Sequence, residues 1–525
     1  MRRSVYRKRH FVCQPALPAR LPASRPVPAG PFDPFLKNRP LAALGLLVLL
    51  MALAVRVITW AQLLPHIDEP ATLLAIEMVA TKGIPLLPSD VLYLQGTLIS
   101  YLGAPFSFLF SGAELLSALQ AVNLLASLSV VVLVYLITAR ITASVLASLF
   151  ASAGVGLDPS MITWSIWVRP YGLLTIQTTA LAYCFLVLIQ DGTDARIGRI
   201  PVRYAMVALF WLGTLTHIGI WMILPSMILV AGMIWGLDLF GKHSRLITAG
   251  ALAVIAPILL TILGSLVGVG STTTNNEGGA GFVGDHLFNL EQIINAEVTL
   301  KVWEKTWHGS QLWGVMAPYV VAISGLLIGG YLQIRSPRML MERRAIFAII
   351  ALYFGPILLI AALAAEGAQS RYLVHILPLG YVLIAVGAWH IARISSRTHL
   401  FGALSMRGLL VAMLLFPTIV FLLQASRWRM EFPDDDPDFF PAMAYVAERH
   451  EPGQPIFVSL PPAAFFTFDD DTVANDLYFL AGPEDRIRTT RYVKRQPDRS
   501  VTDYWLGVPA VTSTEQLCDM LREHA

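Results

Sequence analysis

The sequence predicts an all-α polytopic membrane protein followed by a small C-terminal α/β domain, and two observations lead to this fold class. Of the 525 residues, 55% are hydrophobic and only 14% are charged, with a mean hydropathy of +0.62. Soluble domains carry about 25% charged residues. The segment 426–525 differs from the rest, because it holds 10 Lys and Arg against 18 Asp and Glu although the whole chain carries +3. Such a charge asymmetry indicates a separate domain.

The first 40 residues are basic and rich in Pro and Ala, which is typical of a disordered cytoplasmic arm. The first apolar run begins near position 41 and is too long for the apolar part of a cleavable signal peptide. A helix needs about 20 apolar residues to cross a bilayer. We predict about eleven such spans within the domain 41–425, at 41–63, 113–138, 141–157, 171–190, 201–216, 218–240, 246–268, 311–333, 345–364, 371–392 and 408–425.

Positive charges set the predicted orientation. Lys and Arg are frequent in the N-terminal arm and in every second loop, including 193–203, 335–344 and 393–407, and they are sparse in the loops between. Cytoplasmic loops carry an excess of Lys and Arg. We therefore expect a multi-pass protein of the cell membrane with a cytoplasmic N-terminus and an extracytoplasmic domain at 426–525. The three cysteines lie far apart and indicate neither a disulfide framework nor a metal cluster.

The first outer loop begins with two adjacent carboxylates, Asp68 and Glu69. Pro70 suits the first position of a helix, so the pattern predicts a helix over 70–82 with Glu69 as its N-cap. Its apolar residues repeat with helical spacing, which predicts an amphipathic helix lying in the outer membrane interface; they are Ala71, Leu74, Ala75 and Met78. The alternative is that both acids merely cap this helix and face water.

Further polar residues fall at the outer ends of other spans. Arg169 and Tyr171 open the span 171–190, and His217 closes the span 201–216. Three more open the span 371–392, namely Arg371, Tyr372 and His375. Each has an ordinary alternative: Arg169 can be a snorkelling interface residue, and His217 a hydrogen-bonded packing residue. Together they place a carboxylate among cationic groups at one depth. Ionisable groups near lipid are usually functional, and this set suits a lipid phosphate.

At these residues the chain resembles the GT-C glycosyltransferases, in particular the group of protein O-mannosyltransferases, the lipid A aminoarabinose transferase and the Rgt-type bacterial sugar transferases. The resemblance rests on the Asp-Glu pair after the first span. It continues with "MVATKGIPLLPSDVLYLQG", "RPYGLL", "LTH" and "SRYLVHILPL", and it covers most of 41–425.

The resemblance implies a polyprenyl-phosphate sugar as donor and transfer of the sugar on the extracytoplasmic face, with inversion, to a lipid, glycan or protein acceptor. It assigns the general base to Asp68, with Glu69 as its neighbour. It makes a group of residues candidates for substrate binding, with the donor phosphate assigned to Arg169, Arg371 and His375. The remaining candidates are Tyr171, His217 and Tyr372, together with Tyr93 and Lys82, which lie where some relatives place a phosphate-binding lysine.

Two other classes of function fit the sequence less well. A lipid or glycan transporter or flippase predicts ionisable residues near mid-membrane and inverted repeats with broken helices, and the sequence shows neither. A structural or sensory membrane protein predicts that Asp68 tolerates substitution. A divalent cation such as Mg²⁺ or Mn²⁺ is compatible with the chemistry, but no spacing of His, Asp and Glu demands one. The partners expected are the donor, the acceptor and membrane lipids, with no nucleic acid.

Two segments outside the spans carry predictions of their own. The long outer loop 269–310 is a candidate lid over the substrate. In the tail we expect a helix at about 440–446, a strand in "GQPIFVSL", a helix in "ANDLYFLAG", a strand in "DYWLGVPAV" and a closing helix in "TEQLCDMLREH" capped by Thr512 or Ser513. We expect an accessory role for this domain, such as acceptor presentation.

Overall fold

The computed structural model describes residues 39–93, 96–236, 243–254, 337–363, 370–398, 439–481, 493–496 and 500–523. The predicted spans 311–333 and 408–425, the predicted lid 269–310 and nearly all of the N-terminal arm lie outside these residues. Within them, five helices are long and apolar enough to cross a membrane, or six if one bent pair counts as a single span. The protein is a multi-pass membrane protein, as the composition predicts.

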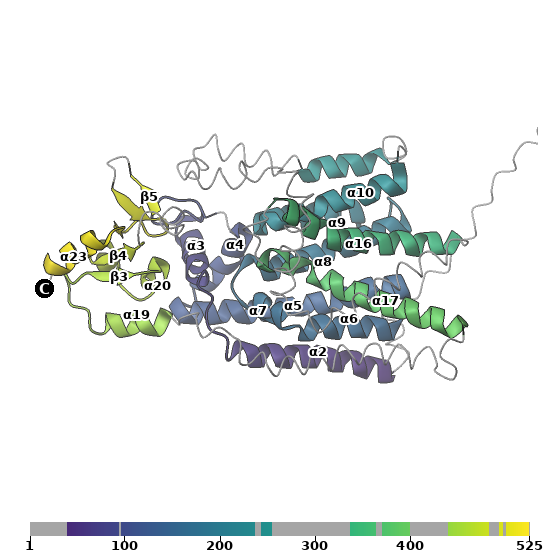
Figure 1. The fold of residues 1–525 in the computed structure, drawn as a ribbon, viewed down its shortest axis with the longest axis horizontal. Helices are drawn as coiled ribbons and strands as arrows, with labels where there is room; N and C mark the ends of the chain where they lie inside the picture. Colours follow the sequence, from purple (N-terminus) through teal and green to yellow (C-terminus); the bar gives the residue numbers. More distant parts are fainter. Residues whose placement is uncertain are drawn as a thin grey trace, which may run out of the picture.

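The membrane domain is a bundle of helices that run side by side along the long axis of Figure 1. Its members coincide with the predicted spans that fall within the described residues, except α7, which lies between the predicted spans 141–157 and 171–190. They are α2 (Arg39–Trp60), α5 (Gly112–Thr142), α6 (Val145–Leu157), α7 (Pro159–Ile166), α8 (Pro170–Asp191), α9 (Val202–Thr216), η1 (Ile218–Ile223), α10 (Leu224–Trp235), the helix Ser244–Val254, α16 (Pro337–Leu363), η4 (Ser370–Ile376) and α17 (Leu377–Thr398).

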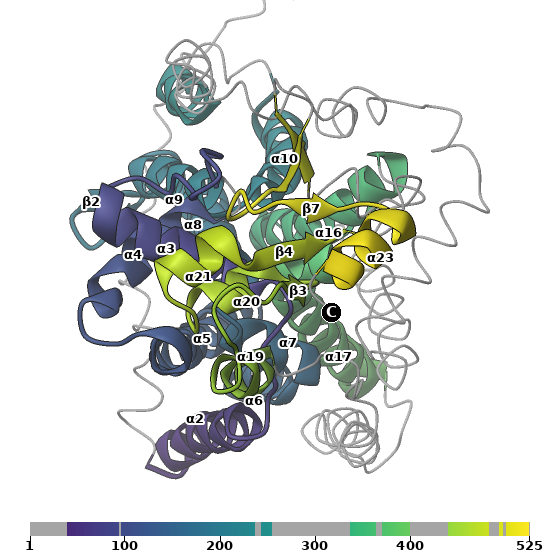
Figure 2. The ribbon, with the colours of Figure 1, turned by 90° about the vertical axis from the view of Figure 1, so that its left-hand side faces the viewer.

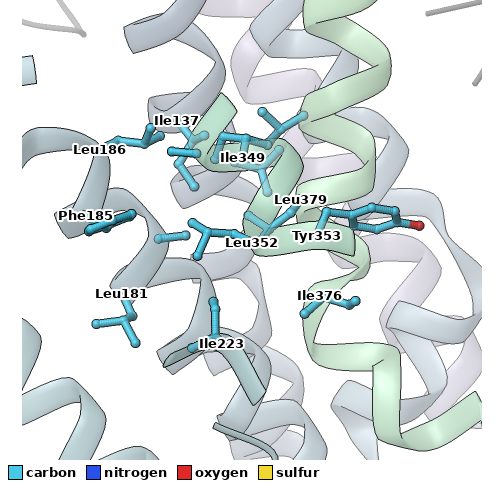
Figure 3. Close-up of a cluster of buried hydrophobic side chains, with 14 of the residues drawn as sticks. Ile137, Leu181, Phe185, Leu186, Ile223, Ile349, Leu352, Tyr353, Ile376 and Leu379 are labelled. Carbon is cyan, nitrogen blue, oxygen red and sulfur yellow. The ribbon is translucent and has the colours of Figure 1, made fainter. Parts of the chain in front are cut away.

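The core of the bundle forms around α8 and α17. Most of the apolar window of each helix is buried, 78% for α8 and 89% for α17, against 11% for α2. A helix that is apolar on all sides belongs inside a bundle or faces lipid, and α2 is the lipid-facing case. Figure 3 shows how the core helices pack together: Leu181 and Phe185 of α8 face Leu352 of α16 and Leu379 of α17.

The chain bends sharply between α6 and α7. Helices α6 and α7 meet at an angle of 58°, and Asp158 lies at the break. Its carboxylate caps α7 by accepting from Met161 N at 2.8 Å, and it also accepts from the Tyr381 hydroxyl of α17 at 2.6 Å. Since Pro159 begins α7 and removes a backbone donor, the chain bends there.

Helix α3 (Glu69–Lys82) lies across one end of the bundle, hereafter the α3 end, beside α4 (Thr97–Ser107) (Figure 1). The predicted helix is present, but two details of the prediction were wrong. Asp68, not Glu69, is the N-cap residue, and its side chain makes no capping bond. The helix is also almost entirely buried within the protein from Glu69 to Val79, so its apolar stripe does not face lipid.

The C-terminal domain is α/β, as predicted. Strands β3 (Ile456–Val458), β4 (Leu477–Leu480) and β7 (Ala510–Val511) form a parallel sheet in the order β3-β4-β7, and β5 (Val493–Arg495) pairs antiparallel with β6 (Val501–Asp503). Its helices are α19 (Phe439–Ala447), α20 (Pro461–Phe465), α21 (Asp470–Asn475) and α23 (Thr514–Glu523). The prediction of a helix in "ANDLYFLAG" was wrong, because this stretch contains β4, the central strand of the sheet.

This domain packs directly onto α3 (Figure 2). The four residues of the predicted apolar stripe on α3 lie in one core with residues of the sheet, including Val458 and Phe479. The opposite face of α3 packs through Leu73 and Ile76 against α4 and α5. The stripe therefore faces protein. An apolar stripe indicates burial, but its spacing does not distinguish a lipid surface from a protein domain.

Candidate functional site

An ion pair between Asp68 and Arg169 lies at the α3 end of the bundle. The Arg169 Nη2 is 3.0 Å from the Asp68 Oδ2. The two side chains differ in exposure, with 6% for Arg169 and 30% for Asp68. A buried guanidinium thus holds a carboxylate that remains open to an incoming molecule. The two residues come from segments about 100 positions apart, and the fold brings together this pair of predicted site residues.

The segment 167–169 sets the direction of Arg169. It follows α7 and is extended, with φ −129° and ψ 155° at Arg169, as expected for a residue that precedes a proline. Two bonds to neighbouring elements fix it: Asn123 of α5 donates to the Trp167 carbonyl at 3.0 Å, and Val168 N donates to the Glu69 carboxylate at 2.6 Å. The Arg169 side chain consequently points from the start of α8 towards the start of α3.

Glu69 is fully buried and joins three segments. Its Oε2 accepts from His66 N at 2.6 Å, its Oε1 accepts from Val168 N, and Gln120 of α5 donates to Oε1 at 3.1 Å. Burial raises the pKa of the Glu69 carboxyl to about 7, and these N–H donors oppose the rise. Glu69 has no access to solvent. Its hydrogen bonds hold together the segments on either side of its neighbour Asp68.

Thr72 and Tyr93 complete the surroundings of Arg169. The Arg169 Nη1 lies 3.2 Å from the Asp68 carbonyl oxygen, 3.2 Å from the Thr72 Oγ1 and 3.4 Å from the Tyr93 hydroxyl. The two hydroxyl oxygens are 3.2 Å apart. Tyr93 is therefore placed in the site, as predicted for the region. The Arg169 Nε is buried and has no acceptor among the described residues.

A row of aromatic rings runs from the ion pair to α9. His66 packs edge-on against Trp167 with ring centroids 4.7 Å apart, Trp164 lies 5.0 Å from Tyr171, and Tyr171 lies 5.2 Å from His217. The His66 Nδ1 also accepts from Asp68 N at 3.1 Å and lies 3.7 Å from the Asp68 Oδ2. Edge-to-face ring pairs stabilise a fixed geometry, so this row supports one wall of the site.

The other predicted site residues have different positions. His217 caps η1 by accepting from Gly219 N at 3.0 Å, in agreement with its packing alternative. His375 of η4 is fully buried against the bundle core. Arg371 and Tyr372 also belong to η4, but their side chains lie outside the described part of the chain. Lys82 is exposed at the far end of α3, which at 1.5 Å per residue puts it about 20 Å from Glu69, so the structure does not bring it to the ion pair.

Metal-binding groups are sparse in this region. Among the described residues no group of three His, Cys, Asp or Glu side chains could hold a metal ion. The compatibility of the site with Mg²⁺ or Mn²⁺ stays a prediction.

The fold has solved counterparts, although no family model matches the chain and no curated protein matches its sequence. An oligosaccharyltransferase, AglB from Archaeoglobus fulgidus, solved with an inhibitory peptide and a dolichol-phosphate, matches 80% of this chain with a TM-score of 0.52 and 13% identity. ArnT from Cupriavidus metallidurans, bound to undecaprenyl phosphate, matches 91% of the chain with a TM-score of 0.51 and 13% identity. The chain has the GT-C fold. It spans 59% of the length of AglB and 95% of the length of ArnT. The fold predicted from the sequence motifs is confirmed.

Several residues of the site escaped sequence reasoning. His66, Thr72 and Gln120 carry no motif of their own, and tryptophans such as Trp164 and Trp167 are ordinary anchors at a membrane interface. Gln120 and Asn123 lie one turn apart near the start of an apolar span. Polar side chains that share a helix face within a span are a usable signal, because such groups need partners inside the protein.

Proposed function

We propose that this protein is a membrane glycosyltransferase that moves a sugar from a polyprenyl-phosphate donor to an acceptor hydroxyl on the extracytoplasmic face. The observation that carries the proposal is the Asp68–Arg169 ion pair at the α3 end of a GT-C fold. Support comes from AglB and ArnT, whose structures hold dolichol-phosphate and undecaprenyl phosphate. Both are polyprenyl phosphates, which is the donor class that the sequence motifs imply.

Asp68 acts as the general base. A hydroxyl is a poor nucleophile at neutral pH, and a positioned carboxylate that accepts its proton as the new bond forms accelerates such a reaction about 10²–10⁴-fold. The Asp68 side chain is 30% exposed and is held through its Oδ2 by Arg169. The carboxylate is thus oriented by Arg169 while its side chain stays partly exposed to an approaching acceptor. Glu69, which is fully buried, cannot reach an acceptor and keeps Asp68 in place.

The leaving group needs no acid. As the acceptor oxygen bonds to the anomeric carbon, the bond from that carbon to the phosphate oxygen breaks, and the polyprenyl phosphate departs as an anion. Fixed cations that stabilise developing charge are a major source of catalysis. Arg169, whose Nε has no acceptor among the described residues, is the cation beside Asp68 that we assign to this charge, and Arg371 and His375 are the other residues that we propose for the phosphate. Attack opposite to the leaving group inverts the configuration at the anomeric carbon.

The direct test compares wild type with Asp68→Asn in transfer from polyprenyl-phosphate sugars by the purified protein. Asn keeps the size of the side chain but cannot accept a proton, so turnover should fall by about two to four orders of magnitude. The fall should appear in kcat, with little change in donor affinity or melting temperature.

The matched control is Asp471→Asn, which removes an exposed carboxylate from α21 of the C-terminal domain. It should leave turnover unchanged. Near-normal transfer by Asp68→Asn would refute its role as the base. The absence of transfer from every polyprenyl-phosphate sugar by wild type would refute the donor class.

A further inference from the structure

An apolar cavity of about 310 Å³ opens on the bundle between α8, α9, α10 and the helix Ser244–Val254. Its walls include Phe185 of α8, Phe210 of α9 and Met227 of α10. Two wall residues, Ile228 and Ile247, are 62% and 38% exposed, so the cavity reaches the surface of the bundle. In Figure 1, α9 and α10 lie on the opposite side of the bundle from α2. Among the described residues, this exposed apolar surface of a membrane-spanning bundle suits contact with lipid chains.

One charged residue, Arg203, lines the cavity. It lies in the first turn of α9, next to the hairpin of β1 (Arg196–Ile197) and β2 (Ile200–Pro201). Its Nη1 donates to the Thr193 carbonyl at 3.2 Å and lies 3.4 Å from a carboxylate oxygen of Asp194, a side chain that is 87% exposed. Its Nε is buried without an acceptor among the described residues. A guanidinium with a free donor therefore sits beside a cavity shaped for hydrocarbon.

We propose that this cavity binds an anionic phospholipid, with one acyl chain between α8, α9 and α10 and the phosphate on Arg203. The lining is too apolar to hold water, because a buried water needs two to four polar partners. An acyl chain suits it, because burying apolar surface on both sides is favourable. The planar guanidinium of arginine binds phosphate oxygens with two parallel hydrogen bonds, and the Nε and a neighbouring nitrogen of Arg203 have this geometry.

The charge around the cavity favours an anionic lipid over a zwitterionic one. Arg196 and Arg199 of the hairpin are both exposed and lie close to Arg203 in sequence. Basic residues at a membrane surface attract anionic lipids. The hairpin thus adds a long-range attraction to the specific contact made by Arg203.

This site is distinct from the proposed donor site. Arg169 precedes the first residue of α8, whereas Phe185 and Leu188 line the cavity near its other end. At 1.5 Å per residue, 16 to 19 residues of helix separate them by about 24–29 Å, most of the thickness of the hydrocarbon core. The lipid therefore belongs to the leaflet opposite the Asp68–Arg169 pair, and its binding does not rest on the proposed function.

The first test removes the phosphate contact. In Arg203→Gln the side chain keeps much of its length but loses its charge, and the retention of phosphatidylglycerol should fall about tenfold, as expected when a hydrogen bond to a charged group is lost. Native mass spectrometry of the detergent-purified protein counts the retained lipids, with phosphatidylcholine as the competing probe. Arg449→Gln removes the same charge from an exposed position of the C-terminal domain, away from the lining, and should retain phosphatidylglycerol as wild type does.

The second test fills the cavity and leaves Arg203 intact. Gly250 lines the cavity, and a Cβ placed there meets no atom within 4 Å. Gly250→Leu should therefore fold normally and displace the acyl chain. Gly232 on α10 has the same open surroundings but does not line the cavity, so Gly232→Leu is the matched control.

The proposal expects Arg203→Gln and Gly250→Leu to lose bound phosphatidylglycerol and the two controls to keep it. Equal retention by all four variants would mean that the lipid belongs to the general lipid shell, and it would overturn the proposal. Equal retention of phosphatidylcholine and phosphatidylglycerol by wild type would overturn the preference for an anionic lipid.

Discussion

The adjacent carboxylates Asp68 and Glu69 have opposite surroundings. Asp68 is partly exposed and paired with a cation, whereas Glu69 is fully buried and bonded only to N–H donors. The start of α3 produces this difference, because successive helix residues point about 100° apart. Two residues of the same chemistry thereby acquire separate tasks, the proposed reaction for one and the alignment of three segments for the other.

Glu69→Gln should destabilise the site even though the side chain keeps its size. Each Glu69 oxygen accepts from a backbone N–H, Oε1 from Val168 and Oε2 from His66. The amide nitrogen of Gln would face one of these donors, and an unsatisfied buried donor costs about 1–3 kcal/mol. We expect a lower melting temperature and faster hydrogen exchange at 66–69 and 167–169. An unchanged melting temperature would show that Glu69 does not hold these segments.

The pH dependence of stability provides the control for this prediction. The pKa of Glu69 is raised from 4.5 to about 7 in the folded protein, so between these values the folded state binds more protons than the unfolded state. The contribution of Glu69 to stability is then largest below about pH 4.5 and decreases as the pH rises to about 7. Melting curves in this window should show that decrease in wild type and a smaller one in Glu69→Gln.

Arg169→Lys tests whether the guanidinium fork matters. Arg169 contacts the Asp68 carboxylate with one nitrogen and Thr72 and Tyr93 with another, and a single ammonium cannot reproduce both sets. A displacement of about 1 Å at a catalytic group lowers turnover about 10²-fold, so kcat should fall by roughly that factor. Arg522→Lys, at an exposed pair with Asp519, is the control. Normal kinetics in Arg169→Lys would reduce Arg169 to an interface anchor.

At the scale of elements, the junction between the C-terminal domain and the loop before α4 is built on Ser89. Its hydroxyl donates to the Tyr504 carbonyl at 2.5 Å, its N–H donates to the Trp505 carbonyl at 3.3 Å, and Lys494 donates to its carbonyl at 2.8 Å. The same loop ends at Tyr93, whose hydroxyl lies near Arg169. The C-terminal domain thus holds a loop that borders the site.

Ser89→Ala should loosen this junction. The loss of one hydrogen bond costs about 1 kcal/mol, and hydrogen exchange of residues 84–93 should rise about fivefold. Turnover should fall less than tenfold, because Asp68 and Arg169 remain in place. The control is Ser129→Ala, which removes an exposed hydroxyl bonded only within α5. Exchange at 84–93 equal to that of wild type would mean that the core around α3 alone holds the loop.

The elements also show how far sequence reasoning reaches. The helix predicted at 70–82 exists as α3, and the closing helix exists with Ser513 as its cap, since Ser513 Oγ accepts from Gln516 N. Local patterns specify such features. The prediction of what α3 packs against was wrong, because the spacing of apolar residues does not show whether their face contacts lipid or protein. The strand β4 was mistaken for a helix, because a short apolar run fits both periods.

Part of the candidate site could also be predicted from the sequence. Motifs or position marked Asp68, Arg169 and Tyr93 as candidates, and the structure brings these three residues together. The links that unite them run from Gln120 of α5 to Glu69 and from Asn123 of α5 to Trp167, over 51 and 44 positions. Such pairings depend on how helices pack, and no local pattern contains that information.

At the scale of the whole molecule, orientation in the membrane is the main prediction. Reporters fused after Ala525 and after Arg343 should read extracytoplasmic and cytoplasmic, because Lys and Arg gather in alternate loops. Phosphatase and fluorescent-protein fusions report the two sides. A cytoplasmic signal from the fusion after Ala525 would mean that the whole orientation is reversed, because the C-terminal domain packs onto α3 and the α3 end would then face the cytoplasm.

The packing of the C-terminal domain onto α3 also has a consequence for synthesis of the chain. The bond between Ser89 and Tyr504 joins residues 415 positions apart. At about 5–20 residues per second, translation separates the two partners by roughly 20–80 s. During that interval the apolar stripe of α3 has been made but not yet covered, so a newly inserted chain needs another surface, lipid or chaperone, to shield it until the tail arrives.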